Sequence, residues 1–353
     1  HSALYDHDLP QHALIVQDWL HELFLDRYTT VFFHHLALFP PSIVVNGRGR
    51  YREFVDPATN ATATTPRFIM HVKQGHRYRI RSIGNMAMEC MLELSVDDHR
   101  LTVIASDSAP IRPLEANSVA LASGERYDFV LHADAPVGKY WLRVTGLNVC
   151  QNLQEKALVV YEGAEDFPEP AEDDPPGSEG GVRLNPFDLK SSDAVLNSND
   201  MVAAEGSDQV KPADVVHYVG LNFNLVNNLN YNDLVHNPAW VTEGNATRFV
   251  GVPSSQINHV SFRPASRPLL TQSREISEFE LCTFRQAEAM REHCAAEFCE
   301  CTQVMEVKLG QVVELVLAEE GFLMHSAHPM HIHGFAFHVL ASGKLNRSSS
   351  LAE

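Results

Sequence analysis

Short stretches of alternating polar and apolar residues, separated by turn-forming residues, dominate the first half of this chain. Tyr78–Ile83 and Glu93–Val96 alternate residue by residue. A period of two places the apolar side chains on one face of a β-strand. Further strand-like runs follow at short spacing, with Gly, Pro and Asp between them: Leu101–Ala105, Val119–Ala122, Tyr127–Leu131 and Tyr140–Val144. Many short strands with such turns predict an all-β fold, a sandwich or a barrel.

A strongly acidic segment separates two parts of the chain. Residues 162–181 hold eight acidic residues, four prolines and four glycines, and no basic residue. A segment of this composition cannot bury apolar surface, so it predicts a solvated linker. The length of 353 residues leaves room for two domains. We therefore expect one domain at residues 9–162, a linker at 163–185 and a last domain at 186–353.

The charge and the apolar runs exclude several classes of partner. The net charge is −18 and the isoelectric point is near 5.4, which argues against nucleic acid or an anionic membrane, because both need basic patches. No run approaches the roughly 20 apolar residues of a membrane span. The chain contains no signal peptide, and its first residue is His1, which indicates a processed or incomplete sequence.

The cysteines indicate either disulfides or a zinc site. Four are clustered and two lie apart: Cys282, Cys294, Cys299 and Cys301, then Cys90 and Cys150. Cys299 and Cys301 are closer than the usual C-x₂₋₄-C zinc pair. N-glycosylation sequons begin at Asn60, Asn245 and Asn346, and they fit a secreted protein. We favour disulfides in an extracellular chain, whose pairing the sequence does not reveal.

A dense histidine segment lies near the end of the chain. Residues 325–338 contain five histidines in 14 positions. Neutral imidazole is the commonest protein metal ligand. If Met330–Leu340 is a strand, His331 and His333 lie on one face. His328 has the opposite parity and precedes a proline, so we expect it to serve a different metal, with Gly334 allowing close backbone approach.

Two other interpretations of this segment were weighed. A lone H-x-H in a strand is commonly a surface pair, but three histidines with Pro329 and Gly334 at fixed offsets favour metal binding. A cupin-type site also uses H-x-H but needs a carboxylate a few residues later. Residues 335–338 offer none, which argues against a cupin.

The segment H-P-M-H-I-H-G-F-A-F-H-V resembles the H-P-x-H-x-H-G-x-x-F-x-V motif in the last domain of three-domain multicopper oxidases of the laccase group. The resemblance implies that His328 binds the type 1 copper and is the point of electron entry. It implies that His331 binds the type 2 copper and His333 a type 3 copper of the oxygen-reducing cluster. Arthropod-type laccases are also similar in their cysteine cluster.

Other segments are similar to the same family. Asp18–Glu22 resembles the D-W-x-H segment that opens the second laccase domain, and residues 1–8 resemble the joint at the end of the preceding domain. The region around Asp97 and His99 resembles a copper-free cupredoxin domain, which implies structural roles for both. We expect His12 and His21 to cap an element or face solvent. The resemblance implies two cupredoxin-like Greek-key β-sandwich domains, the second incomplete.

Part of the family's ligand set is not found in this sequence. The family's first domain supplies H-x-H pairs, but His331 and His333 form the only H-x-H here. The family's final H-C-H motif, which supplies the type 1 thiolate, has no match either. A type 1 site needs His₂Cys. We therefore expect a fragment that lacks the first domain and the end of the third, and we expect this chain alone to be inactive.

The resemblance implies an activity for the full-length parent. It implies a secreted oxidase with four coppers that oxidises phenols, diphenols or aromatic amines one electron at a time and reduces dioxygen to water. Three alternatives remain open: a ferroxidase-type multicopper oxidase, a non-enzymatic cupredoxin-like copper-binding or matrix protein, and a mononuclear zinc protein that uses His328, His331 and His333 together.

Overall fold

The structure is a computed structural model that describes residues 3–26, 39–88, 90–147, 150–173, 181–185, 195–196, 200–204, 210–226, 252–296, 298–319 and 328–343. It has two compact units. The first contains the described residues of His1–Leu23, Leu38–Val210 and Ser326–Lys344, and the second contains those of Phe24–Ala37 and Lys211–His325. These compact units do not test the expected domain limits of 9–162 and 186–353, which stay a prediction.

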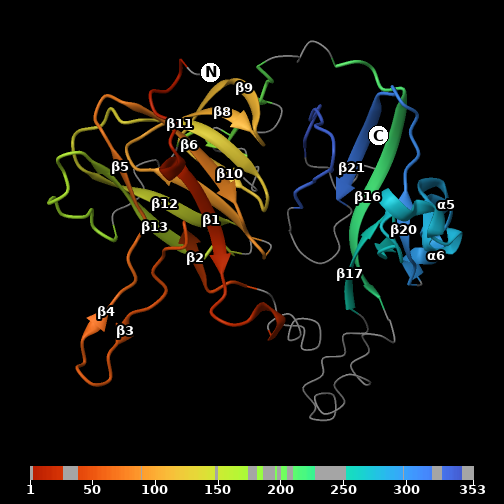
Figure 1. The fold of residues 1–353 in the computed structure, drawn as a ribbon, viewed down its shortest axis with the longest axis horizontal. Coiled ribbons are helices and arrows are strands. Elements are labelled where there is room, and N and C mark those ends of the chain that lie inside the picture. Colours follow the sequence, from red (N-terminus) through yellow and green to blue (C-terminus); the bar gives the residue numbers. More distant parts are fainter. Residues whose placement is uncertain are drawn as a thin grey trace. The chain divides into compact units, whose positions relative to one another are not determined.

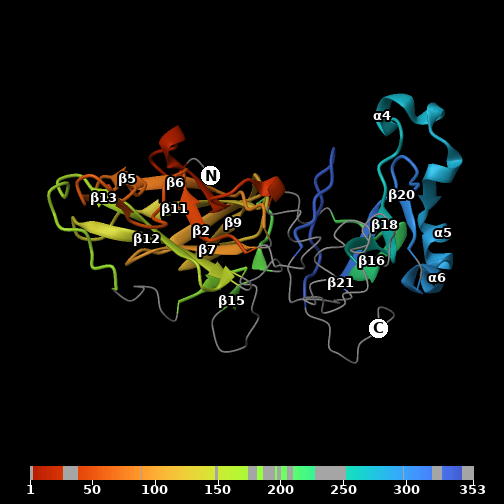
Figure 2. The same ribbon diagram turned by 90° about the horizontal axis from the view of Figure 1, so that it is seen from below.

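The described residues of the first unit form two large sheets and a separate two-stranded hairpin (Figures 1 and 2). One sheet contains β2 (Ser42–Val45), β1 (Ala13–Trp19), β6 (Arg77–Gly84), β11 (Arg126–His132), β8 (Leu101–Ser106) and β9 (Ala109–Ala116), in that order. The other contains β15 (Val195–Leu196), β14 (Arg183–Leu184), β10 (Ser118–Leu121), β7 (Met91–Val96), β12 (Lys139–Leu147), β13 (Gln154–Tyr161) and β5 (Ile69–Val72). The predicted all-β class is confirmed.

The alternation of the sequence explains the core of the first unit. Along β6, every second residue is buried, from Tyr78 to Gly84. Buried side chains of both sheets form one apolar core, which includes Leu14, Ile80, Leu92 and Phe129. At roughly 25 cal/mol per Å² of apolar surface removed from water, a core of this kind is the main stabilising term. The disulfide Cys90–Cys150 adds a covalent link.

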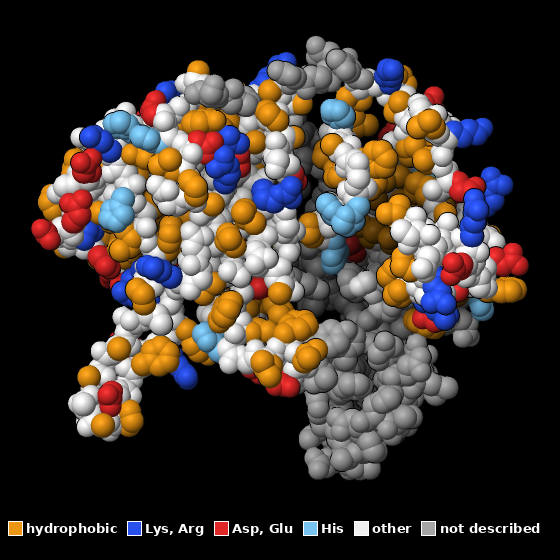
Figure 3. Space-filling model, viewed as in Figure 1, with side chains coloured by type: hydrophobic (Ala, Val, Ile, Leu, Met, Phe, Trp, Pro, Cys, Tyr) orange, Lys and Arg blue, Asp and Glu red, His pale blue; other side chains and the backbone are white. Residues whose placement is uncertain are grey.

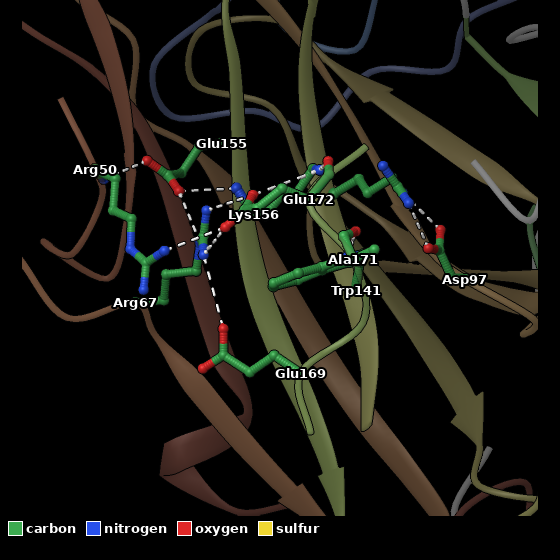
Figure 4. A network of polar contacts seen from close by, with 10 residues as sticks. Arg50, Arg67, Asp97, Trp141, Glu155, Lys156, Glu169, Ala171 and Glu172 are labelled. Carbon is green, nitrogen blue, oxygen red and sulfur yellow. Dashed lines mark hydrogen bonds and ion pairs between the residues drawn. The ribbon is translucent and has the colours of Figure 1, made fainter. Parts of the chain in front are cut away.

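The described part of the acidic segment is largely exposed, as expected of a solvated linker, but it is also held to the first unit by specific polar contacts (Figure 4). The Arg67 guanidinium donates to both carboxylate oxygens of Glu172, at 2.6 and 3.0 Å. Trp141 Nε1 donates to the carbonyl oxygen of Ala171 at 3.1 Å. Arg67 is largely buried, and a buried cation requires counter-charges. Composition alone could not reveal this requirement, because it arises from Arg67, which lies 105 residues earlier in the chain than Glu172.

The described part of the second unit has one sheet with helices at one end (Figure 1). Its strands, in order, are β19 (Leu281–Thr283), β20 (Glu300–Val304), β18 (Val260–Phe262), β17 (Val252–Ile257), β16 (Val215–Val226) and β21 (Val313–Glu319). The helices are α4 (Leu269–Gln272), α5 (Phe284–Ala289) and α6 (Arg291–Ala296), with 3-10 turns η6 (Ser273–Glu275) and η7 (Glu278–Glu280). None of the helices in the described residues has the length and apolar character needed to cross a bilayer.

The clustered cysteines of the second unit form two disulfides, Cys282–Cys301 and Cys294–Cys299. The prediction of disulfides is therefore confirmed. Three of these half-cystines pack with Val260 and Ala287 in a small buried cluster. Helix α5 was not predicted, although a capping box marks its start: Thr283 and Gln286 exchange hydrogen bonds at its N-terminus.

Candidate metal centre

Residues 328–343, which include the described part of the histidine segment, form no strand in the structure. The expected strand Met330–Leu340 is therefore wrong. Gly334 has a φ of +87°, which interrupts an extended conformation in the middle of the segment. The expected close approach of backbone at Gly334 is also not seen, since no atom lies within 4 Å of where its Cβ would be. Gly334 instead allows the chain to turn at this position.

His331 and His333 lie side by side in this segment. Their ring centroids are 4.8 Å apart and the rings meet edge to face, at 85°. Both residues are exposed. The H-x-H spacing thus brings two imidazoles to one place even without a strand. Among the described residues, no three His, Cys, Asp or Glu side chains are grouped so that they could hold an ion.

The residues present fit a partial copper ligand set. Imidazole nitrogen suits copper, and the His331–His333 pair offers two such donors close together. His328 does not join them in a three-ligand cluster within the part of the chain that the structure describes. All six cysteines are in disulfides, so none of them can supply the thiolate of a type 1 site. The assignment of His328, His331 and His333 to particular coppers stays a prediction.

Asp97 and His99 hold a turn of the first unit, as predicted. Arg143 donates two hydrogen bonds to the Asp97 carboxylate, at 2.8 and 2.7 Å, in a buried ion pair. The two ring nitrogens of His99 lie 2.6 Å from the Asp97 carbonyl oxygen and 2.7 Å from the Tyr161 hydroxyl. Burial lowers the pKa of His99. Both ring nitrogens are engaged, so neither is available to a metal.

The D-W-x-H segment has a structural role in the first unit. The buried Asp18 carboxylate accepts hydrogen bonds from the backbone N–H groups of Ala87 and Met88, at 2.9 and 2.7 Å. Burial raises the pKa of Asp18, and these hydrogen bonds oppose the rise. His21 is exposed, as expected, and its Nε2 lies 2.9 Å from the Ser42 hydroxyl.

The expectation that His12 caps an element or faces solvent is wrong. It is only 2% exposed. The 3-10 turn η1 (Pro10–His12) directs its ring edge-on against Tyr78, with the centroids 5.0 Å apart. Desolvation lowers the pKa of His12. The packing against Tyr78, 66 residues later in the chain, is a tertiary effect that no local pattern signals.

A pocket of about 740 Å³ in the second unit was not predicted. Its lining includes His217, Phe284 and Met305, and the His217 and Phe284 rings are 5.9 Å apart. Strand β16 carries His217, and no local sequence pattern signals a hollow beside it. None of the predicted copper ligands lines this pocket.

The strands of the first unit, which form two sheets around one apolar core, define a class of fold, that of the β-sandwich proteins. Two family models, both described as multicopper oxidase, match residues 11–164 and 263–352, which together make up more than half of the chain. The chain belongs to the multicopper oxidase family.

Several relatives are similar in sequence. Laccase-2 of Pleurotus ostreatus is 26% identical over 353 residues, covering 97% of this chain and 52% of the relative. Laccase-4 of Thanatephorus cucumeris is 33% identical over 179 residues, covering 46% of this chain and 31% of the relative. Oxidoreductase OpS5 of Beauveria bassiana is 33% identical over 153 residues, covering 42% of this chain and 25% of the relative. The chain spans about half the length, or less, of these relatives.

Two solved structures share the fold. A laccase variant from B. aclada matches with a TM-score of 0.52 and 18% identity, covering 79% of this chain and 46% of that one. Fet3p, described as a multicopper oxidase that functions in iron import, matches with a TM-score of 0.53 and 14% identity, with the same coverage of both chains. At these identities the likeness shows the cupredoxin-like fold alone.

Proposed function

We propose that the complete protein containing this chain is a laccase-like oxidase, which takes electrons one at a time from phenols, diphenols or aromatic amines and reduces dioxygen to water. In this proposal His328 is a ligand of the type 1 copper, where electrons enter, and His331 and His333 are ligands of the type 2 and type 3 coppers. The H-P-x-H-x-H-G segment, with its two adjacent imidazoles, in a chain of this family carries the proposal.

The chain's own residues would hold and orient the metal ions. Copper, when bound, supplies the one-electron chemistry that the side chains themselves lack. His331 and His333 present two imidazole nitrogen donors close together, and His328 presents a third outside that pair. Because the cysteines here are all oxidised to disulfides, the type 1 thiolate in this proposal comes from residues outside this chain.

A ferroxidase is the alternative, and Fet3p is among the structural neighbours. Iron sites in proteins commonly combine imidazole with a carboxylate ligand. Residues 328–343 contain no Asp or Glu. This segment itself therefore offers no carboxylate to Fe(II), and oxygen uptake distinguishes the two kinds of reductant.

Oxygen uptake tests the proposal. The complete protein and the 353-residue chain are each loaded with copper and given a catechol, an aromatic amine or Fe(II). The complete protein is expected to consume oxygen fastest with the organic reductants, and the 353-residue chain is expected to consume none. Preference for Fe(II) would favour the ferroxidase. Copper binding by the complete protein without oxygen uptake would favour a non-enzymatic copper-binding protein.

We also propose that the protein is secreted. Its three disulfides persist in an oxidising compartment and are uncommon in the cytosol. Detection of the protein outside the cells that express it, by mass spectrometry, would support this, and confinement to the cytosol in the reduced form would contradict it.

A further inference from the structure

A two-stranded hairpin projects from the sandwich of the first unit (Figure 1). Strands β3 (Phe54–Val55) and β4 (Thr62–Ala63) pair with each other in an antiparallel register and with no other strand that the structure describes. The sequon Asn60-Ala61-Thr62 lies at its end, and all three residues are exposed. The other two sequons, which begin at Asn245 and Asn346, lie outside the described residues.

The turn between the two strands is held by the chain itself. The Asp56 carboxylate accepts hydrogen bonds from the backbone N–H groups of Ala58 and Thr59, at 2.7 and 3.2 Å. The backbone N–H of Asn60 donates to the Asp56 carbonyl at 2.8 Å. Asn60 has a φ of +54°, a left-handed conformation that Asn tolerates better than most residues. These contacts fix Asn60 at the end of the hairpin.

The amide and hydroxyl groups that glycosylation of this sequon requires are both accessible. Within the described structure, neither the Asn60 carboxamide nor the Thr62 hydroxyl makes a hydrogen bond. An N-glycosylation acceptor needs an accessible Asn amide and, two residues later, an accessible hydroxyl. Both are present, on a hairpin that leaves space around them.

We propose that Asn60 carries an N-linked glycan that shields the exposed apolar side chains of the hairpin. In the reaction, the Asn60 amide nitrogen forms a bond to the anomeric carbon of an oligosaccharide carried on a lipid pyrophosphate. The bond between that carbon and the pyrophosphate oxygen breaks, the lipid pyrophosphate leaves, and the amide gives up one proton. No change of oxidation state is involved, and the proposal does not depend on the oxidase function.

The hairpin has an apolar surface that a glycan would cover. Phe54 and Val55 are 50% and 58% exposed, and hydrophobic side chains are visible on the hairpin in the space-filling view (Figure 3). Val55 is the direct cross-strand partner of the sequon residue Thr62. A two-stranded ribbon with open edges and exposed apolar residues is prone to pair with another chain. A glycan at Asn60 places a bulky polar group beside this strand.

Peptide mapping tests the modification. The protein is expressed with a signal peptide in a eukaryotic host, and secreted and retained fractions are both digested with and without N-glycanase. We expect the peptide with Asn60 to carry a glycan that the enzyme removes. Asn60→Gln and Thr62→Ala should each lose one glycan, whereas Thr62→Ser, which keeps the sequon, should retain it. An unmodified Asn60 in both fractions would overturn the proposal.

Light scattering tests the shielding. Asn60→Gln is expected to aggregate faster than the glycosylated protein, and the added changes Phe54→Ser and Val55→Thr are expected to restore the slower rate. Equal aggregation of the glycosylated protein and Asn60→Gln would overturn the shielding role. The mapping result would then stand by itself, and neither result bears on oxygen uptake.

Discussion

The two units of this chain are stabilised in different ways. In the first, buried side chains from two sheets form one continuous core, with Tyr127, Tyr161 and Phe129 among its largest members. Among the residues that the structure describes in the second, the buried cluster is small and consists largely of half-cystines. Apolar residues on β16 and β21 remain substantially exposed, among them Tyr218, Leu315 and Leu317. Burial of apolar surface therefore dominates in the first unit, and covalent links contribute a larger share in the second.

Matched leucine substitutions should show the largest difference between the units. Leu92 is fully buried, so Leu92→Ala removes transfer energy and leaves a cavity, and it should destabilise the first unit by about 2–5 kcal/mol. Leu315 is 42% exposed, so Leu315→Ala should cost the second unit less than about 1 kcal/mol. Urea unfolding followed by circular dichroism measures both. Equal costs would mean that the second unit has a core of the same kind.

Removal of a disulfide should affect the second unit next most strongly. The double variant Cys282→Ser, Cys301→Ser should destabilise it by about 3 kcal/mol, since the bond restricts the unfolded chain. Hydrogen exchange read by mass spectrometry should show lost protection in β19 and β20. The control, Cys90→Ser with Cys150→Ser, should leave the strands of the first unit protected, because their apolar core remains. Unfolding of both units by either double variant would break the comparison.

Acid should weaken the first unit through its buried histidines. Burial lowers the pKa values of His12 and His99, whereas in the unfolded chain both histidines take up protons near the usual value of about 6.5. The unfolded state then binds more protons than the folded one as pH falls below about 6.5, so stability decreases in that direction. His99→Gln, which can still hydrogen bond, should flatten this dependence in urea unfolding at a series of pH values. An unchanged slope would exclude His99 as a contributor.

Removing a carboxylate charge from the acidic segment should have the smallest effect on the stability of the first unit. The Arg67 guanidinium lowers the pKa of Glu172 through their hydrogen bonds, so this contribution is present above the usual value near 4.5 and is lost as pH falls. Glu172 is 57% exposed, and screening by water limits the loss in Glu172→Gln to about 1 kcal/mol or less. Glu162→Gln, at an exposed pair with Lys73, is the control and should cost less. A larger loss from the control would show that the segment is not held through Arg67.

A feature could be predicted from the sequence where it depends on neighbouring residues, and not where it depends on residues far apart in the chain. The strands of the first unit follow from local alternation, as in β6, because the period of two is a property of neighbouring residues. The burial of His12 and the pairing of Arg67 with Glu172 depend on contacts between distant segments, which no local pattern contains. The sequence did not reveal the disulfide pairing either, because the pairing also depends on how distant segments meet.

At the candidate site, residue identity was more informative than conformation. The histidine spacing predicted that His331 and His333 lie together, and their rings do so. The strand that was expected to carry them does not form: Gly334 bends the chain, and no described strand pairs with this segment. A motif can fix which side chains are neighbours over two residues, but a strand also requires hydrogen-bonding partners from elsewhere.

Copper spectroscopy of the complete protein tests the central claim, that His328 serves one copper centre and His331 with His333 another. Visible absorption and electron paramagnetic resonance would be compared for His328→Ala, His331→Ala and the exposed control His338→Ala. The first variant should lose the blue type 1 signal and keep the type 2 signal, the second should do the reverse, and the control should keep both. Simultaneous loss of both signals in the first two variants, or of neither, would contradict the claim.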